Sequence, residues 1–149
     1  YPYSPQYEAS GTSTLVDGLR GGDEYRTGDW QGYYATPFEA TIDLGKSKTI
    51  TSMTLGCIQD IRPWIWLPEN VEFFTSSDGV NFELLERVTH NVLEDDYENQ
   101  VFRFKTNSMI SDVRFVRVKA NPRGLIPEWH LGAGFDRWTF VDEWEITYK

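Results

Sequence analysis

The chain has 149 residues, of which 40% are hydrophobic and 15% aromatic, a composition typical of one globular domain and not of a disordered segment. Its 23 acidic and 14 basic residues give a net charge of −9 at pH 7. This charge argues against nucleic acid and against an anionic membrane as partners, because both need a basic face. The sequence has no apolar run of about 18 residues, so it predicts no membrane-spanning helix.

The start of the chain and its cysteine content say little about compartment. Tyr1-Pro2-Tyr3-Ser4-Pro5 resembles a linker and carries no signal-peptide pattern, so we expect one domain over residues 1–149, cut from a longer protein. The single cysteine, Cys57, cannot form an internal disulfide. It lies in the apolar-rich segment Ile50–Ile58, where a small buried hydrophobic role is expected.

Short alternating segments between turn signals predict β-strands along most of the chain. The first, Phe38–Leu44, stops at Gly45-Lys46, and the second covers Thr49–Ile58. Val71–Thr75 and Phe82–Val88 then flank Ser77-Asp78-Gly79, which predicts a hairpin because glycine accepts a positive φ.

The remaining strands are predicted at Val101–Phe104, at Phe115–Lys119 and at the C-terminus. The last strand is expected to place Phe140, Trp144, Ile146 and Tyr148 on one face, with Val141, Glu143 and Glu145 on the other. Successive strands with long connections rich in glycine and proline predict an all-β antiparallel β-sandwich or jelly roll, with function in the end loops.

Five of the six tryptophans lie among turn-forming residues, outside any clean strand pattern: Trp30, Trp64, Trp66, Trp129 and Trp138. Large flat rings on loops suit stacking on sugars, bases or partner side chains. The alternative is that such rings seal the ends of the β-structure. Five together favour a binding surface.

Catalytic motifs are weak throughout the chain. Glycoside hydrolysis needs two carboxyl groups facing each other across a cleft, which sequence neighbours such as Asp95-Asp96 do not supply. The two histidines, His90 and His130, belong to no metal-binding spacing, and Cys57 has no activating base nearby. We therefore expect a non-catalytic domain.

Several short sequence motifs, which follow one another along nearly the whole chain, resemble those of coagulation factor V/VIII type C (discoidin-like) domains. They also resemble motifs of the family-32 carbohydrate-binding modules, which share that fold. They are Leu15-Val16-Asp17-Gly18, Phe38–Gly45, Val71–Phe82, Val113–Val118 and Asp142–Ile146. The resemblance implies a discoidin-like jelly roll that binds ligands in loops at one end.

A narrower resemblance rests on Pro127–Gly134, with Trp138 and Asp142-Glu143 following. These residues are similar to C-terminal modules of bacterial β-hexosaminidase (chitobiase-like) enzymes. The similarity implies an accessory module of an exported glycan-degrading enzyme from a gut-type Bacteroidetes bacterium. The module is then expected to be secreted, periplasmic or on the cell surface, to be a monomer, and to have the parent catalytic domain and a glycan as partners.

The resemblance also implies a structural Ca²⁺ between an early Asp-Gly loop and a late glutamate. Asp17 and Glu143 match these positions, and Asp23 or Thr27 could complete the shell, because calcium takes six to eight oxygen ligands. The extra residues Arg20–Glu24 depart from the usual pattern. An arginine in the metal position, or an acidic turn without metal, therefore remains an alternative.

Two loops have the composition of a shallow sugar site, which combines apolar walls with a few polar groups. The first, Gln59–Pro68, carries Trp64 and Trp66 between two prolines, and the second carries Trp129. The polar residues predicted beside these rings are Asp60, Arg62, Glu128 and His130, with Asp29, Tyr33 and Tyr34 as further candidates at the same end.

Comparison with the sequence pattern of this fold assigns two of the loop tryptophans to the core. Trp30 resembles a structural tryptophan of the family and Trp138 opens the final strand, which leaves Trp64, Trp66 and Trp129 as predicted sugar platforms. Two other interpretations stay open. The domain could present its tryptophan-rich loops to a protein in adhesion, or pack passively against its catalytic neighbour.

Overall fold

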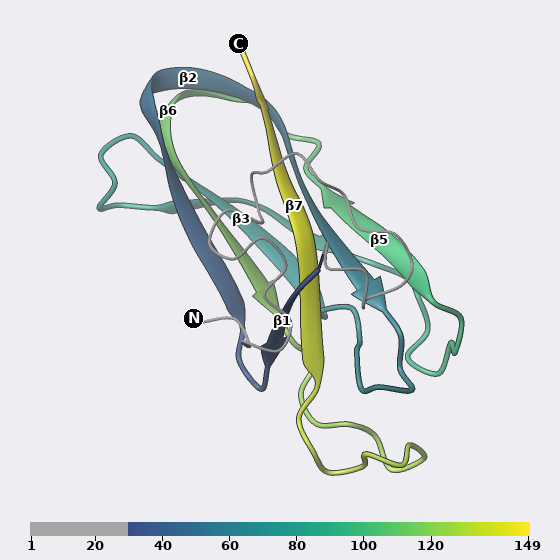
Figure 1. Ribbon diagram of the computed structural model, residues 1–149. Coiled ribbons are helices and arrows are strands. Elements are labelled where there is room, and N and C mark those ends of the chain that lie inside the picture. Colours follow the sequence, from purple (N-terminus) through teal and green to yellow (C-terminus); the bar gives the residue numbers. More distant parts are fainter. Residues whose placement is uncertain (1–29) are drawn as a thin grey trace.

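The computed structural model describes residues 30–149, which form seven β-strands and confirm the predicted antiparallel, discoidin-like β-sandwich (Figure 1). The strands are β1 (Gln31–Tyr34), β2 (Phe38–Gln59), β3 (Asn70–Ser76), β4 (Glu83–Thr89), β5 (Gln100–Lys105), β6 (Ile110–Asn121) and β7 (Trp138–Tyr148). Their hydrogen-bonded order is β1-β7-β2-β6-β3-β4, and β5 pairs with β2. Within residues 30–149 there is no helix with the length and apolar character needed to cross a membrane.

β2 merges the two strands that the sequence predicted on either side of Gly45. Its first part, from Phe38 to Asp43, pairs with β6, while its second part pairs with β7 and β5. The register shifts between Asp43 and Ile50, where Gly45 has a φ of 86°. Glycine adopts this left-handed conformation without a Cβ clash, so the chain bends over and the strand continues. β2 therefore joins the layer of β6, β3 and β4 to the layer of β1, β7 and β5 (Figure 1).

The main core lies between these two layers. Phe38 and Phe73 contribute from one layer, and Leu55, Phe104 and Trp144 from the other, each at most 1% exposed. Cys57 is fully buried in the same cluster, as predicted, and its burial raises the pKa of the thiol. Its role is therefore that of a small apolar side chain.

The predicted face pattern of the last strand is wrong at its start. Phe140 belongs to a second buried cluster with Trp30, Ile58 and Ile65, whereas Trp144 lies in the main core. The cause is a bulge between β2 and β7, because Leu55 pairs with Trp144 and Cys57 with Val141, so that two steps on β2 face three steps on β7. Phe140 and Trp144 therefore point to opposite faces.

The bulge also accommodates a buried ion pair. Arg103 Nη1 lies 2.9 Å from Asp142 Oδ2, and the Asp142 side chain has no exposed surface. A Cβ on Gly56 would collide with both Arg103 Nη1 and Asp142 Oδ1, so this position requires glycine. The adjacent Glu143, also buried, donates its backbone N–H to Asp142 Oδ1 at 2.5 Å.

Two further predictions concern local structure. The hairpin at Ser77-Asp78-Gly79 is confirmed, since it joins β3 to β4 and Gly79 has a φ of 78°. Trp30 is 1% exposed and Trp138 is partly buried against the same cluster. The shift of these two rings toward the core is therefore confirmed.

Candidate functional site

Three loops meet at one end of the sandwich, which we call the loop end (Figure 1). They are residues 60–69 between β2 and β3, 90–99 between β4 and β5, and 122–137 between β6 and β7. Trp66 Nε1 donates to Glu94 O at 2.9 Å, and His130 Nε2 bonds to Ile61 O at 2.6 Å, so the first loop is joined directly to the other two. All seven predicted sugar-binding residues lie in the first and third loops.

The first loop is a tight turn closed by its own backbone. Asp60 and Ile65 exchange two hydrogen bonds, each 3.0 Å long, and Trp64 N donates to Ile61 O at 3.1 Å. Trp64 has a φ of 72°, which bulky side chains rarely adopt, and its carbonyl accepts the Trp138 N–H at 2.8 Å. Asp60 is only 7% exposed, so it lies beneath the surface, and its contact with a sugar stays a prediction.

Trp66, a predicted sugar platform, lies in the core, and its use as a platform stays a prediction. It is 2% exposed and packs with Ile61 and Ile126. The Arg137 guanidinium lies 4.6 Å from the centroid of its indole ring, and the His130 ring meets it edge-on at 5.0 Å. Ile126, Arg137 and His130 belong to the 122–137 loop, so the Trp66 ring joins that loop to the 60–69 loop.

His130 likewise has a structural role in the loop end, and its predicted contact with a ligand stays a prediction. It is 7% exposed and both ring nitrogens are engaged. The Gly132 N–H donates to Nδ1 at 2.9 Å, and this leaves Nε2 to donate to the Ile61 carbonyl at 2.6 Å. The histidine thus ties the 122–137 loop to the 60–69 loop.

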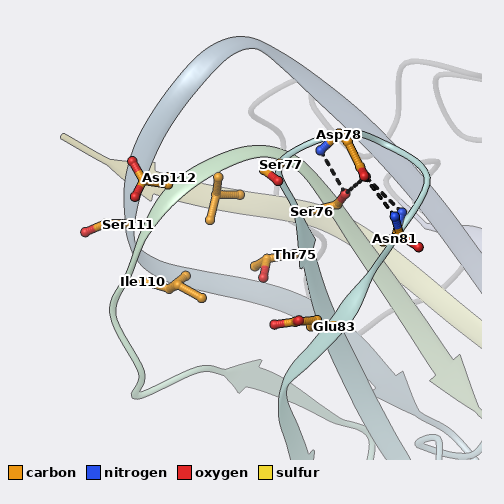
Figure 2. A pocket seen from close by; sticks show the side chains of 10 residues that line it. Thr75, Ser76, Ser77, Asp78, Asn81, Glu83, Ile110, Ser111 and Asp112 are labelled. Carbon is orange, nitrogen blue, oxygen red and sulfur yellow. Dashed lines mark hydrogen bonds between the residues drawn. The ribbon is translucent and has the colours of Figure 1, made fainter.

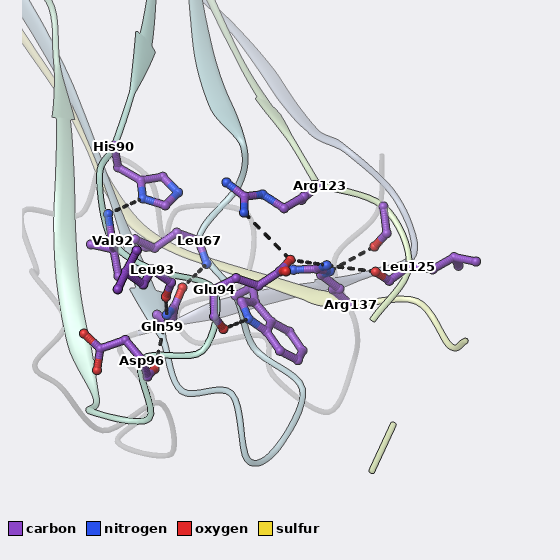
Figure 3. A network of polar contacts seen from close by, with 12 residues as sticks. Gln59, Leu67, His90, Val92, Leu93, Glu94, Asp96, Arg123, Leu125 and Arg137 are labelled. Carbon is purple, nitrogen blue, oxygen red and sulfur yellow. Dashed lines mark hydrogen bonds and ion pairs between the residues drawn. The ribbon is translucent and has the colours of Figure 1, made fainter. Parts of the chain in front are cut away.

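A buried arginine that no sequence pattern marked, Arg137, completes this support (Figure 3). The Arg137 guanidinium pairs with Glu94 Oε2 at 2.5 Å and donates to Gly124 O at 3.0 Å and Leu125 O at 2.8 Å. Its side chain is only 4% exposed. Gln59 in turn donates to Leu93 O at 3.0 Å, so the 90–99 loop is held from two sides. Charge-assisted bonds of this kind rigidify the surface above them.

The half-buried Trp64 ring, which belongs to the 60–69 loop, packs against the 122–137 loop. Its ring stacks on Phe135 with centroids 5.5 Å apart and an interplanar angle of 25°. A Cβ on Gly132 would come within 2.6 Å of Trp64 Cε2, so only glycine permits this approach. One predicted sugar platform is therefore partly used in packing, and Phe135, which is 59% exposed, covers it.

The exposed rings form a different set, which we call the aromatic patch: Trp129, Tyr97 and the Arg62 side chain beside them. Trp129 is 47% exposed and Tyr97 42% exposed, and their ring centroids lie 6.1 Å apart. The Arg62 guanidinium lies 5.0 Å from the Tyr97 centroid and donates to the Tyr97 carbonyl at 3.1 Å. Trp129 and Arg62 were predicted, whereas Tyr97 was missed because it stands alone in an acidic loop.

The polar groups around the aromatic patch are mostly acidic. Glu128 is exposed next to Trp129, as predicted, and Asp95 and Glu98 are exposed in the 90–99 loop near Tyr97. Such a rim repels anionic ligands. The aromatic patch therefore offers two ring faces, one guanidinium and several carboxylate acceptors, a combination suited to a neutral ligand rich in hydroxyl groups.

The predicted calcium ligands fall mostly outside the described residues. Asp17, Asp23 and Thr27 lie there, and Glu143 is 7% exposed on β7 beside the Arg103–Asp142 pair. Within residues 30–149 no group of three or more acidic, histidine or cysteine side chains could hold a metal ion. The described part thus contributes Glu143 alone, and calcium stays a prediction.

Comparison with known proteins supports the fold. No protein-family model matches the chain, and no curated protein matches it. Among solved structures the chain is similar to CBM32-1 from a family 31 glycoside hydrolase of Clostridium perfringens, with a TM-score of 0.54 and 20% identity over 100% of this chain and 89% of that one. This likeness shows that the two share a fold.

Two other solved structures are similar at a lower level. The C-terminal domain of a chitobiase from Bacteroides fragilis has a TM-score of 0.47 and 17% identity, covering 93% of this chain and 80% of that one. CBM32-3 from a family 31 glycoside hydrolase of Clostridium perfringens has a TM-score of 0.47 and 13% identity, covering 80% and 75%.

Proposed function

We propose that this domain is a non-catalytic carbohydrate-binding module that binds a neutral glycan in a shallow site on the aromatic patch. The observation that carries the proposal is the exposed Trp129–Tyr97 pair, 6.1 Å between centroids, beside the Arg62 guanidinium. Flat rings take the apolar faces of sugars, while Arg62 donates to hydroxyl groups and Glu128 accepts from them. Trp64, with Phe135 stacked on it, extends the apolar surface.

The rigidity of the loop end supports this use of the aromatic patch. Trp66, His130 and Arg137 hold the loops beneath the rings, so little conformational freedom is lost when a ligand binds. A site open to solvent with few buried contacts gives weak single-site binding. We therefore expect the module to add its weak affinity to that of a larger protein, which binds the same glycan at more than one site.

The fold likeness supports a place for the domain beside a catalytic unit. CBM32-1, which shares the fold, comes from a family 31 glycoside hydrolase. We propose that this chain is likewise an accessory module of an exported bacterial glycan-degrading enzyme. The chitobiase-like, β-hexosaminidase parent and the Bacteroidetes source belong to this proposal and rest on the resemblance at Pro127–Gly134.

A glycan array followed by calorimetric titration of the best hit tests the proposal. Trp129→Ala should weaken binding by at least about tenfold, equal to about 1.4 kcal/mol. Leu131→Ala is the matched control, because Leu131 lies two positions away, is 103% exposed and should leave binding unchanged. An unchanged affinity in both Trp129→Ala and Tyr97→Ala would contradict a site at the aromatic patch.

A second function is favoured by the apolar tip of the 122–137 loop. Leu125 and Phe135 are each 59% exposed and Leu131 is 103% exposed, which is typical of a surface that docks onto protein. This is the passive-packing or adhesion alternative. Leu125→Ser with Leu131→Ser should then weaken association with the parent catalytic domain while glycan binding persists.

Calcium binding is a separate proposal that rests on Asp17, Asp23, Thr27 and Glu143. An ion joining the early loop to β7 would stabilise the fold by about 2.7 kcal/mol at a free concentration 100 times its Kd. Addition of a chelator should lower the melting temperature, and Asp17→Ala should remove that difference. If neither change affects the melting temperature, no structural calcium is present.

A further inference from the structure

A polar cavity of about 230 Å³ lies at the opposite end of the sandwich from the aromatic patch (Figure 2). It is bounded by the hairpin after β3 and by the first residues of β6. β6 ends, and β3 begins, at the loop end, so the hairpin and the start of β6 lie at the far end of both strands. The proposed glycan site therefore does not include this cavity.

The ionisable groups that line the cavity are all carboxylates: Asp78, Glu83 and Asp112. Hydroxyl and amide groups surround them, and no lysine, arginine or histidine of the described chain takes part in the lining. The nearest cations along the chain are engaged elsewhere. Arg114 pairs with Asp43 at 3.0 Å, and Arg117 pairs with Glu39 at 3.6 Å. The lining itself therefore contributes negative charge and no positive charge.

The three carboxylates have different roles. Asp78 is structural, because it accepts the Val80 and Asn81 backbone N–H groups at 2.9 and 2.8 Å and bonds Ser76 Oγ at 3.0 Å. These bonds hold the pKa of Asp78 far below its usual range. In contrast, no hydrogen bond or ion pair joins the Glu83 or Asp112 carboxylate to another residue that the structure describes. Both remain available to a ligand.

Thr75 gives an independent indication that this cavity is built for a ligand. The residue is only 5% exposed and lines the cavity, yet no hydrogen bond links its hydroxyl to another residue within 30–149. Figure 2 shows its side chain between Glu83 and Ile110. The hydroxyl is not one of the fully enclosed polar atoms without a partner in residues 30–149, so it faces the open cavity. A ligand with a polar group at this point would bond to it.

We propose that this cavity binds a small molecule bearing a primary ammonium group, with Glu83 and Asp112 as counter-charges and the Thr75 hydroxyl as a further hydrogen-bond partner. An ammonium group has three N–H donors, and a carboxylate is an acceptor only, so the two are complementary. The volume is below the range of about 300–1,000 Å³ that is usual for drug-sized ligands, which restricts the ligand to roughly the size of one sugar ring.

A divalent metal ion fits the cavity less well than an ammonium group. No set of three or more acidic, histidine or cysteine side chains among residues 30–149 is arranged to hold a metal. Both oxygens of Asp78 are also already bonded within the hairpin, since Oδ1 accepts the Val80 and Asn81 backbone N–H groups and Oδ2 accepts from Asn81 Nδ2. Two separate carboxylates and a hydroxyl suit a ligand that supplies several hydrogen-bond donors in different directions.

Protonated glucosamine, compared with glucose, tests the proposal on the isotope-labelled domain by NMR at pH 6. Glucosamine should shift the amide signals of residues 75–83 and 110–113, and glucose at the same concentration should not. Glu83→Gln and Asp112→Asn should each weaken glucosamine binding by at least about fivefold, and added salt should weaken it further. Asparagine is the right replacement at Asp112 because its φ of 61° is in the left-handed region, which asparagine tolerates.

The controls separate this site from the aromatic patch. Asp95→Asn removes the same charge from the loop end and should leave the glucosamine shifts unchanged, as should Trp129→Ala. Thr75→Val keeps the shape of the side chain and should weaken binding. The proposal is overturned if glucosamine shifts none of these amides, if glucose shifts them equally, or if CaCl₂ shifts them and displaces glucosamine.

Discussion

The two ends of the sandwich are held together by contacts of different range. At the loop end, Trp66 bonds to Glu94 and His130 to Ile61, over sequence separations of 28 and 69 residues. At the hairpin end, the bonds of Asp78 reach no farther than three residues along the chain. The first end is assembled by tertiary packing, whereas the second forms from its own segment.

This difference matters for how each end can bind a ligand. The loop end presents rings whose positions depend on three loops staying packed, so one buried substitution should disturb the whole aromatic patch. The hairpin end needs only a short self-bonded turn beside the start of β6. Its exposed carboxylates, Glu83 and Asp112, can therefore be changed with little effect on the fold.

Trp66→Ala should cause the largest loss of stability and tests the dependence of the loop end on packing. Removing a buried tryptophan side chain costs about 3–5 kcal/mol, because a cavity remains. Trp129→Ala is the matched change at an exposed ring of the same end and should alter the free energy of unfolding far less. Urea denaturation measures both. Equal losses would show that Trp66 is not the core residue described above.

Arg137→Met should have the next largest effect. It keeps most of the side-chain volume but leaves Glu94 and the carbonyls of Gly124 and Leu125 without their donor, at a cost of roughly 2–4 kcal/mol. Amide exchange in residues 122–137 should also accelerate.

Arg114→Met is the control for Arg137→Met, because it removes an equally well-aligned arginine from an exposed pair with Asp43. That change should alter the free energy of unfolding very little. If the two substitutions cost the same, the buried pair does not organise the loop end.

The elements of the fold that the sequence predicted correctly are those held by local contacts, and those it missed depend on long-range contacts. Ser77-Asp78-Gly79 specified its hairpin because the bonds that form it lie within the segment. The alternation in Phe38–Leu44 predicted a strand for the same reason. The bulge that separates Phe140 from Trp144 was missed, because it depends on the offset between β2 and β7, which no local pattern encodes.

The candidate site was predicted only in part. Trp64 and Trp66 occupy equivalent positions in the same proline-bounded loop, yet only Trp66 is buried, because Arg137 and His130 cover it from a distant loop. The apolar Ile65 and Leu67 on either side of Trp66 were the available signal for burial. Tyr97 has no such neighbours, and only its approach to Trp129 marks it as part of the aromatic patch.

Gly132→Ala should lower the free energy of unfolding by an intermediate amount, and the loss should depend on the Trp64 ring. The added Cβ would lie 2.6 Å from Trp64 Cε2 and 3.0 Å from Ile126 Cδ1, and overpacking of this kind costs about 1–3 kcal/mol. Most of this cost should vanish when Trp64→Ala is also present, because the ring that meets the new methyl group is gone. A double-mutant cycle in urea measures the coupling. Simple additivity would mean that Gly132 matters for another reason.

Asp78→Asn should have the smallest effect, confined to the hairpin end and dependent on pH. The pKa of Asp78 is lower in the folded state than the value of about 3.9 expected when unfolded, so its carboxylate contributes stability above that value and loses it as the pH falls. The difference in unfolding free energy between wild type and variant should therefore shrink between pH 6 and about pH 2. A difference that is constant over this range would contradict a role for the charge. Faster amide exchange at Val80 and Asn81, without change at residues 122–137, would show that the two ends are held independently.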